Sequence, residues 1–362
     1  MSFPTRKIGG VEVSAIGFGA MSLGGAYGAP GDDEERFKLL DAAYASGCTM
    51  WDTADIYMDS EEILGKWFKR TGKRDEIFLA SKFGFVAVTG DRVIDGSPEY
   101  ARKALEKSLK QLNVNCIDLY HLHRADPFVP IEHTVRAMAE FVKYRRAKLG
   151  TLDSEVSAAT LRRAHAVHPI AAVQVEYSPI TLDIEDPKIA LLETCRELGI
   201  TTIAYSPLGR GLLSGLYRSP EDLDPQDFRR MIERQPSFPC LVSSPPFFFA
   251  NLCTSPRYNA TNFPNILKIA EGLTSIGKKY GGATSSQIAL AWLLAQGTDV
   301  IPIPGTKSIK YLEENLAAIK ITLSDEDVAA IRQLAVEADA QQGERYPPAL
   351  PQVLFVDTPA FE

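Results

Sequence analysis

The 362-residue sequence lacks the features that would assign it to a membrane, secretory or nucleic-acid-binding class. It contains no apolar run of about 18 residues, the length needed to span a bilayer, and its N-terminus has no apolar signal core. It also has no block of lysine and arginine, and its formal net charge of -7 gives no general attraction to nucleic acid or to an anionic membrane. We therefore expect a cytoplasmic protein without a nucleic-acid or membrane partner.

Cysteine is scarce as well. The five cysteines are scattered, odd in number and never spaced as Cys-x-x-Cys. This distribution indicates reduced thiols rather than a disulfide framework or a zinc site, so no metal is expected. A chain of this length buries a large core without cross-links, and 45% hydrophobic with 23% charged residues is ordinary for a globular protein.

Apolar, strand-like segments alternate with helix-like segments along most of the chain. Seven segments are typical of strands, at residues 16–20, 48–52, 77–81, 116–122, 172–175, 201–205 and 300–303, and the helical stretches between them include 33–45, 98–112, 131–142, 158–167 and 188–198. This alternation predicts a parallel sheet covered by helices. Two short alternating runs around Gly9-Gly10 predict a hairpin over residues 6–13.

The number of strands decides between a closed barrel and an open sheet. Eight strands would close a barrel, whereas six or seven also fit a doubly wound sheet. An eighth strand is expected between helices 131–142 and 158–167, where residues 148–153 are a poor candidate. A dinucleotide-binding open sheet is disfavoured, because Ser22 stands where the third glycine of its fingerprint would be.

Four polar residues follow the predicted strands. Asp52, Lys82 and His123 end or follow three successive strands, and Tyr57 lies in the loop after the first of them. Active sites of α/β barrels are built at the carboxyl ends of several strands, so this placement favours the barrel. Taken singly, each residue is equally well explained as a cap, a packed aromatic or a solvated strand end, and either His121 or His123 could face the covering helices.

Together, the four side chains have the chemistry to reduce a carbonyl group. A tyrosine phenol with a pKa of about 10 is a poor acid at neutral pH. A nearby ammonium favours the phenolate and so makes the phenol a stronger proton donor, and Lys82 is the candidate. Asp52 would hold Lys82 charged, and His123 would donate a hydrogen bond to the carbonyl oxygen.

Longer segments around these residues resemble those of the aldo-keto reductases, most of all the aryl-alcohol dehydrogenase and pyridoxal reductase-like branches. The segments are 51–57, 81–84, 118–124, 174–179, 204–211 and 303–307. The resemblance implies a single domain over 1–362, with a core from about 5 to 346, folded as a (β/α)8 TIM barrel with an N-terminal β-hairpin cap and an extra C-terminal helix. It also implies that Tyr57 is the proton donor, that Asp52, Lys82 and His123 support it, and that His121 is structural.

The same resemblance implies that NADP(H) is the cofactor. Tyr205 would stack on the nicotinamide, whose carboxamide Gln174 and Ser154 would hold. Residues 206–208 would cradle the pyrophosphate through backbone amides, while Lys307 and Lys310, which also fit a solvated helix surface, would offer charge to a 2′-phosphate. The expected cofactor contacts are Ala20, Met21, Asp52, Ser154, Gln174, Tyr205, Ser206, Pro207, Leu208, Arg210, Gly211, Gly305, Thr306, Lys307, Tyr311, Glu314 and Asn315.

The expected reaction is the reduction of an aldehyde or ketone to an alcohol. Aromatic residues expected near the barrel mouth, namely Tyr27, Trp51 and Phe83, favour aryl or heteroaryl aldehydes, with pyridoxal among them. Tyr27, Phe83 and Arg124 are the expected substrate contacts, and Arg124 would suit an anionic substituent or face the cofactor.

Two alternatives remain open, together with the oligomeric state. One is an NADP-binding, redox-sensing subunit similar to the β subunits of potassium channels, which keep the same four residues. The other is a catalytically impaired paralogue whose fifth strand is degraded. No assembly segment stands out, so a monomer or weak homo-oligomer is expected.

Two stretches depart from the family pattern. In residues 143–153, Asp153 stands where an apolar strand residue is expected, which would turn Ser154 away from the nicotinamide. Residues 235–256 form an atypical insertion rich in Pro, Ser, Phe and Cys. The insertion is interpreted as translated intron or, alternatively, as an apolar lid on the substrate loop, since loops tolerate insertions and carry specificity.

Overall fold

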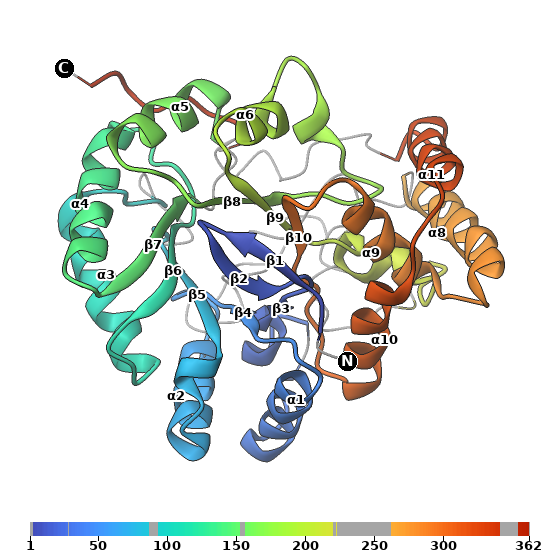
Figure 1. The fold of residues 1–362 in the computed structure, drawn as a ribbon, viewed down its shortest axis with the longest axis horizontal. Helices are drawn as coiled ribbons and strands as arrows, with labels where there is room; N and C mark the ends of the chain where they lie inside the picture. The colour runs from blue at the N-terminus through green and yellow to red at the C-terminus, as the bar shows by residue number, and fades with distance from the viewer. Residues whose placement is uncertain are drawn as a thin grey trace, which may run out of the picture.

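The computed structural model describes residues 3–27, 29–86, 93–152, 156–219, 222, 262–340 and 354–361. Both Ser154 and the insertion 235–256 lie outside these residues. Parallel strands follow one another in sheet order, and helices surround them (Figure 1). The strands are β3 (Phe18–Gly19), β4 (Met50–Asp52), β5 (Phe78–Phe83), β6 (Ile117–Leu122), β7 (Ala147–Leu152), β8 (Ala172–Glu176), β9 (Thr201–Tyr205) and β10 (Val300–Pro302).

Helices follow most of these strands. The α-helices are α1 (Asp33–Ala45), α2 (Ser60–Thr71), α3 (Pro98–Gln111), α4 (Ile131–Lys143), α5 (Ala158–Val167), α6 (Leu191–Glu197), α8 (Phe263–Gly277), α9 (Ser285–Ala295), α10 (Ile309–Ala317) and α11 (Asp325–Glu337), and two short 3-10 helices, η1 (Ala20–Gly24) and η4 (Gly209–Ser214), also matter for the site. Helix α3 begins as its sequence indicates, since the Ser97 side chain caps it and a proline occupies its first turn.

The sheet closes on itself between its first and last strands. Gly17 donates its backbone N–H to the Pro302 carbonyl at 2.9 Å, and Gly19 donates to Pro304 at 3.1 Å. These bonds join β3 to β10, at opposite ends of the eight-stranded order. The expected (β/α)8 barrel is therefore confirmed, and α11 supplies the extra C-terminal helix.

The eighth strand lies where the sequence was a poor candidate. Strand β7 pairs with β6 at five positions, from Ile117 opposite Ala147 to Leu122 opposite Leu152, but with β8 only at Leu152 opposite Val173. The residues of β7 have a low intrinsic preference for strands, but hydrogen bonds to the neighbouring strands stabilise the extended conformation. The fifth strand of the barrel is thus present.

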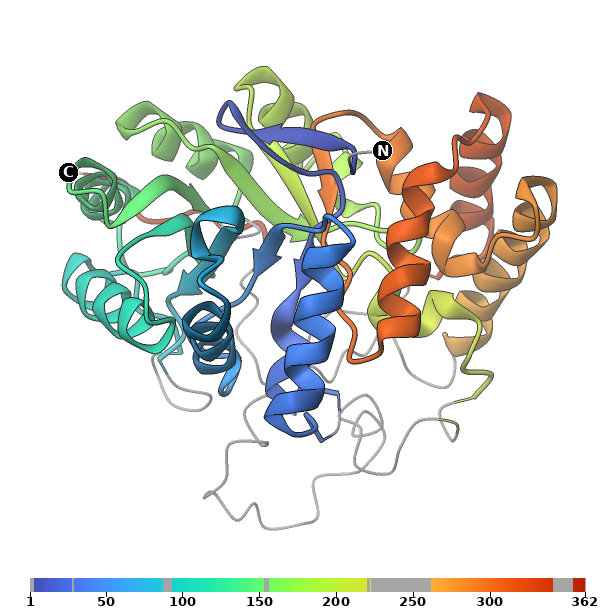
Figure 2. The same cartoon turned by 60° about the horizontal axis from the view of Figure 1, so that its bottom comes forward.

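The predicted hairpin covers the amino-terminal end of the barrel (Figure 2). It consists of β1 (Thr5–Ile8) and β2 (Val11–Ser14), which are antiparallel. Ile8 and Val13 pack with the apolar interior of the barrel, and Thr201 donates its hydroxyl to the Lys7 carbonyl at 2.8 Å. With this end filled by side chains, a ligand can enter only from the carboxyl ends of the strands.

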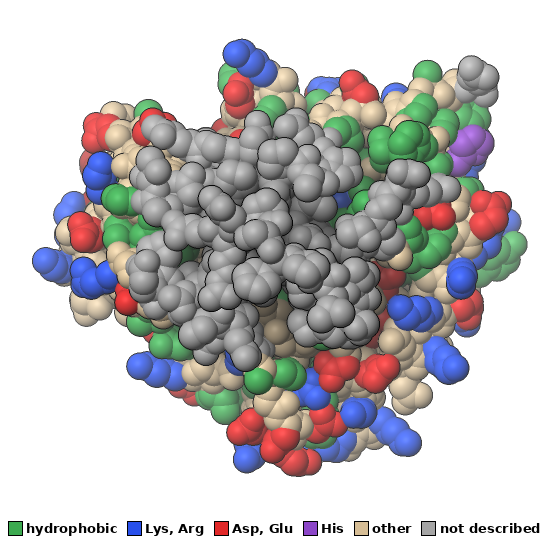
Figure 3. Space-filling model, turned by 180° about the vertical axis from the view of Figure 1, so that it is seen from behind, with side chains coloured by type: hydrophobic (Ala, Val, Ile, Leu, Met, Phe, Trp, Pro, Cys, Tyr) green, Lys and Arg blue, Asp and Glu red, His purple; other side chains and the backbone are tan. Residues whose placement is uncertain are grey.

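The C-terminal residues return to the barrel beside α4 and α5 (Figure 1). Val356 pairs in parallel with Val156, and the Arg163 guanidinium donates to the Thr358 and Pro359 carbonyls at 2.9 and 2.6 Å. Acidic and basic side chains are interspersed around the rim of the face opposite the hairpin (Figure 3). Among the helices in the described ranges, none is long and apolar enough to cross a bilayer.

Candidate active site

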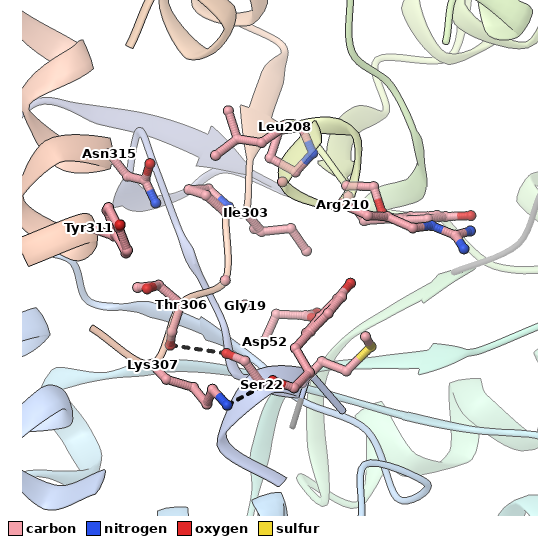
Figure 4. A pocket seen from close by; sticks show the side chains of 18 of the residues that line it. Gly19, Ser22, Asp52, Leu208, Arg210, Ile303, Thr306, Lys307, Tyr311 and Asn315 are labelled. Atoms are coloured by element: carbon pink, nitrogen blue, oxygen red, sulfur yellow. Dashed lines mark hydrogen bonds between the residues drawn. The ribbon is translucent and has the colours of Figure 1, made fainter. Parts of the chain in front are cut away.

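A cavity of about 470 Å³ opens at the carboxyl ends of the strands (Figure 4). Its wall combines strand ends, the η1 and η4 segments and the start of α10. Tyr57 and His123 line it after the ends of β4 and β6, and Lys307, Tyr311 and Asn315 line it around the start of α10. The cavity therefore joins the residues predicted for catalysis to those predicted for the cofactor.

Lys82 lies at the centre of the predicted catalytic group. Its side chain is fully buried and forms an ion pair with Asp52. The ammonium also donates to the Thr53 carbonyl at 2.9 Å and contacts the Tyr57 hydroxyl at 3.4 Å. The Gln174 amide donates to the second Asp52 oxygen at 2.8 Å. Strand alternation thus brings Asp52 and Lys82 inward from neighbouring strands, within reach of the loop that carries Tyr57.

His123 faces the same phenol. The two rings are nearly perpendicular, with centroids 5.8 Å apart, and the Phe85 ring lies 4.8 Å from the imidazole on another side. His121 is fully buried and sits opposite Lys82 in the β5–β6 register, so it faces inward, below the cavity, rather than toward the helices. The cavity is therefore lined by His123 and not by His121.

Burial is the largest cause of the pKa shifts of His123 and Asp52. It lowers the pKa of His123 well below the ordinary value, and the nearby positive charges of Lys82 and Arg124 lower it further. The imidazole is therefore neutral at neutral pH and can donate one N–H. Burial raises the pKa of Asp52, while the Lys82 ammonium and the Gln174 amide act in the opposite direction.

Most of the predicted contacts line the cavity. They are Met21, Tyr27, Asp52, Gln174, Tyr205, Ser206, Pro207, Leu208, Arg210, Gly211, Gly305, Thr306, Lys307, Tyr311, Glu314 and Asn315, together with Arg124. Ala20 is fully buried outside the lining. Arg124 contacts the Tyr205 hydroxyl at 3.2 Å, so it faces the predicted nicotinamide side.

Two aromatic predictions are wrong. Phe83 is fully buried, and its ring stacks on Tyr120 at 5.1 Å. Trp51 is also fully buried, against Trp67 at 4.7 Å. Each directly neighbours an inward-facing catalytic candidate, Lys82 or Asp52, and successive side chains on a strand point to opposite faces. Phe83 and Trp51 therefore pack outward under the helices and cannot contact a substrate.

Several lining residues were missed from the sequence. They include Gly19, Ser22, Ile56, Phe85, Ser214, Leu216, Tyr217, Thr284, Ser286, Ile303 and Pro304. Thr284 had a detectable signal, because it begins the capping box of α9 with Gln287. Its hydroxyl also contacts the Glu314 carboxylate at 2.7 Å, which brings α9 and α10 together at the cavity. Leu216 and Tyr217 follow η4 in a loop without any comparable pattern.

The end of the cavity away from His123 fits an extended anionic ligand. No side chain caps the first turn of α10 at Ser308, and exposed Lys307 and Lys310 stand beside it. A helix start with free N–H groups and nearby ammonium groups favours phosphate. A Cβ on Gly305 would lie 2.7 Å from the Gly19 carbonyl oxygen, so only glycine allows this close approach of the two backbones.

The loop after β9 adopts backbone conformations that ordinary residues rarely take. Ser206 and Arg210 have φ values of 48° and 56°, and Gly209 has 54°. Strained conformations of this kind persist where the surrounding structure holds them and often mark ligand sites. The loop lines the cavity, with Leu208 and Arg210 across it from Thr306 (Figure 4).

Comparison with known proteins identifies the architecture. The profile of the Aldo/keto reductase family matches residues 15–336. Aldo-keto reductase str7 of Strobilurus tenacellus is 54% identical over 94% of both chains, and aldo-keto reductase yakc (NADP+) of Schizosaccharomyces pombe is 45% identical over 99% of both. A glycerol dehydrogenase from Gluconobacter oxydans has a similar fold, with a TM-score of 0.74 and 23% identity over 93% of this chain and 97% of its own. The chain belongs to the aldo/keto reductase family.

Proposed function

We propose that the protein is an NADP(H)-dependent reductase that converts aldehydes or ketones to alcohols, with Tyr57 as the proton donor. The observation that carries this proposal is the contact of the buried Lys82 ammonium with both the Asp52 carboxylate and the Tyr57 hydroxyl. The cofactor is supported by the fit of the cavity to an extended phosphate-bearing ligand and by the name of the yeast relative, which includes NADP+.

The bound cofactor would supply the hydride, and the protein would handle the proton and the geometry. As negative charge develops on the carbonyl oxygen, Tyr57 would transfer its phenolic proton to that oxygen. Lys82 would stabilise the resulting phenolate, because a neighbouring cation favours the charged form of the phenol. Asp52 would keep the ammonium in position, and neutral His123 would orient the carbonyl by donating a hydrogen bond.

The other end of the cavity would hold the dinucleotide. Tyr205 would lie against the nicotinamide, with its hydroxyl held by Arg124, while residues 206–211 would surround the pyrophosphate. Lys307, Lys310 and the uncapped start of α10 would receive the adenosine phosphate. Arg124 would therefore position Tyr205 rather than select an anionic substrate.

The substrate class is proposed from the apolar lining near Tyr57. Ile56 directly precedes Tyr57 and Phe85 packs against His123, and both line the cavity together with Tyr27 and Tyr217. Aromatic walls favour a flat ligand through stacking and apolar contact. We therefore place aryl and heteroaryl aldehydes, including pyridoxal, ahead of aliphatic aldehydes. We place the reaction in the cytoplasm, where the free thiols of Cys48, Cys116 and Cys195 would remain reduced.

The test is NADPH oxidation by the purified protein with aromatic aldehydes, aliphatic aldehydes and pyridoxal. Tyr57→Phe should lower kcat by about 10²- to 10⁴-fold, the usual range for removing a general acid. Binding of NADPH, followed by fluorescence, should change little in this variant. Tyr144→Phe is the matched control, because Tyr144 is exposed and outside the cavity.

The outcomes separate the alternatives. Turnover retained in Tyr57→Phe would exclude the donor role. Tight NADPH binding without turnover on any aldehyde would favour a redox-sensing subunit. The impaired-paralogue alternative assumes that the fifth strand of the barrel is degraded. That strand is β7, and its pairing with β6 at five positions argues against this alternative.

A further inference from the structure

The loop between β4 and α2, residues 53–59, carries Tyr57 and contains a strained backbone conformation. Met58, the next residue after Tyr57, has a φ of 54°, in the left-handed region that residues with a side chain rarely adopt. Such a conformation costs free energy and persists only where the surrounding structure imposes it. Because Met58 adjoins the proposed proton donor, the contacts that impose this conformation also decide where the Tyr57 backbone lies.

The 3-10 helix η1 packs directly against this loop. A Cβ on Gly24 would clash with the Tyr57 carbonyl oxygen, so the contact requires glycine. The same carbonyl accepts the backbone N–H of Ser60 at 2.9 Å. The Ser60 hydroxyl in turn donates to the Ala20 carbonyl at 3.0 Å, at the start of η1. The Tyr57 backbone is therefore held between η1 and the first turn of α2.

One buried guanidinium connects η1 to the same loop. Arg36, near the start of α1, is only 7% exposed. Its Nη1 donates to the Leu23 carbonyl of η1 at 3.2 Å and to the two Asp59 carboxylate oxygens at 2.9 and 2.8 Å. Its Nη2 donates to Asp33 of the same helix. Helices α1 and α2 lie side by side (Figure 1), and Arg36 joins the two loops that precede them.

Asp59 has an unusual role for its position. It is the N-cap of α2, where an aspartate normally accepts an N–H from the first turn of the helix. Among the described residues of that turn, none donates to its side chain. The carboxylate is instead bound by Arg36. Since Asp59 directly follows Met58, this ion pair fixes the loop one peptide unit from the strained residue.

Taking the proposed function as its basis, we propose that Arg36 is a positioning residue for Tyr57. By tying η1 to Asp59, it imposes the left-handed conformation of Met58 and so keeps the Tyr57 hydroxyl beside the Lys82 ammonium. Rates are sensitive to such placement, because a shift of about 1 Å can cost about 10²-fold. Among the described residues that line the cavity Arg36 is absent, so it acts through the loop and not by contact with a ligand.

The first experiment compares the wild type with Arg36→Met, which keeps most of the apolar stem but removes the guanidinium. For an aromatic aldehyde, kcat should fall about 10- to 100-fold, while KM and the Kd for NADPH change by no more than about 3-fold. The side chains of Asp33 and Asp59 are 38% and 43% exposed, so their carboxylates stay solvated and the variant should fold. Arg36→Lys keeps the charge but not the planar fork, so it should recover part of kcat.

Double substitutions separate positioning from general damage. In a Tyr57→Phe background, Arg36→Met should lower the residual rate by less than about 2-fold, because residues that act as a unit are not additive. In a Met58→Gly background its effect on kcat should also shrink, because glycine adopts the left-handed conformation without strain. Losses of equal size in all three backgrounds would overturn the proposal.

Arg70→Met is the matched control. Arg70 also joins α2 to α1, through Asp41, and within the described chain it makes no bond to η1 or to the loop of residues 53–59. This exposed pair should contribute little, so kcat should stay within about 2-fold of the wild type. If Arg70→Met lowered kcat as much as Arg36→Met, the effect would belong to the packing of the two helices and the positioning role would be excluded.

Another readout does not depend on turnover. The Ser60 amide donates to the Tyr57 carbonyl, so its hydrogen exchange reports on the loop. Exchange in residues 57–60 should be faster in Arg36→Met than in the wild type and unchanged in Arg70→Met. Equal exchange in all three proteins would contradict the proposal. Absence of aldehyde turnover in the wild type would refute the proposed function and leave this measurement decisive for the role of Arg36 in holding the loop.

Discussion

The two ends of the cavity are built in different ways. At the catalytic end, Asp52 and Lys82 project from strands and are almost completely buried, and their positions are set by a paired sheet. At the end proposed for the cofactor, Lys307, Lys310 and Tyr311 are exposed and lie on a loop and the first turn of a helix. Proton transfer requires fixed, desolvated groups, whereas a dinucleotide must enter and leave, so each construction suits its task.

Substitutions at the two ends should therefore affect different properties of the protein. A change at the catalytic end disturbs a buried charge and should therefore affect folding as well as turnover. A change at the cofactor end alters close backbone contacts or solvated charges, which weigh more on binding than on folding.

The largest effect is expected for Lys82→Met. Removing the ammonium leaves the Asp52 carboxylate buried and without its cation, which costs about 3–5 kcal/mol of unfolding free energy. Turnover should fall together with stability, because Tyr57 loses its neighbouring charge. Urea unfolding followed by circular dichroism measures the first effect, and NADPH oxidation measures the second.

The control for this variant is Lys66→Met. Lys66 also pairs with a carboxylate, that of Asp33, at 2.6 Å, but its side chain is 55% exposed. The loss of such a surface pair costs about 0–1 kcal/mol. Equal destabilisation by the two variants would contradict the contrast between buried and exposed charge.

An intermediate effect is expected for Gly305→Ala. The added Cβ would lie 2.7 Å from the Gly19 carbonyl oxygen, and one of two backbones must then move. We expect NADPH binding to weaken by about tenfold or more, with a stability loss of about 1–3 kcal/mol, the usual cost of overpacking. Fluorescence titration with NADPH gives the binding constant.

Gly150→Ala provides the matched glycine. A Cβ at Gly150 meets nothing within 4 Å, so NADPH binding should be unchanged and stability should change by no more than about 1 kcal/mol. Unchanged NADPH affinity in Gly305→Ala would show that the backbones at Gly19 and Gly305 can move apart without consequence.

A pH-dependent effect on stability is also expected near the catalytic end. Burial and the neighbouring Glu61 carboxylate raise the pKa of Asp55 from 3.8 to about 8. Between these values the folded protein binds a proton that the unfolded chain has released, so this group lowers the unfolding free energy as pH rises from about 4 to 8. Asp55→Asn removes the contribution, and its stability relative to the wild type should increase across this window.

Urea unfolding at several pH values from 5 to 8.5 measures the difference, with exposed Asp75→Asn as the control. Asp75→Asn reports the effect of removing a carboxylate from the exposed surface. A flat difference for Asp55→Asn would mean that Asp55 is ionised in the folded protein at neutral pH, contrary to its burial.

Sequence patterns were reliable where a regular period connects a residue to a face. The alternation of strands and helices predicted a parallel sheet covered by helices, and the position of Asp52, Lys82 and His123 at strand ends favoured its closure into a barrel. Side chains also alternate between the two faces of a strand. Trp51 is next to inward-facing Asp52 and Phe83 is next to inward-facing Lys82, so both are expected to face outward. Nearness in the chain to a catalytic candidate is therefore a poor guide to substrate contact, because the face of the strand decides which side chains reach the barrel interior.

Other features had no sequence period to reveal them. Residues 147–152 have weak strand character and became β7 through pairing with a neighbouring strand. The lining by Leu216 and Tyr217 depends on how a loop folds back over the cavity. Side-chain bonds such as Lys307 to the Tyr27 carbonyl join residues 280 positions apart, and no local pattern specifies such a contact.

Local periods and residue chemistry were enough to predict the order of strands and helices, a parallel sheet, and a group of four residues whose chemistry suits carbonyl reduction. The folded structure was needed to show that β7 completes the sheet, that Arg124 reaches Tyr205, and that Lys307 reaches the Tyr27 carbonyl. Closure of the barrel brings β3 and β10 together, and contacts made by closure depend on the whole fold rather than on any segment.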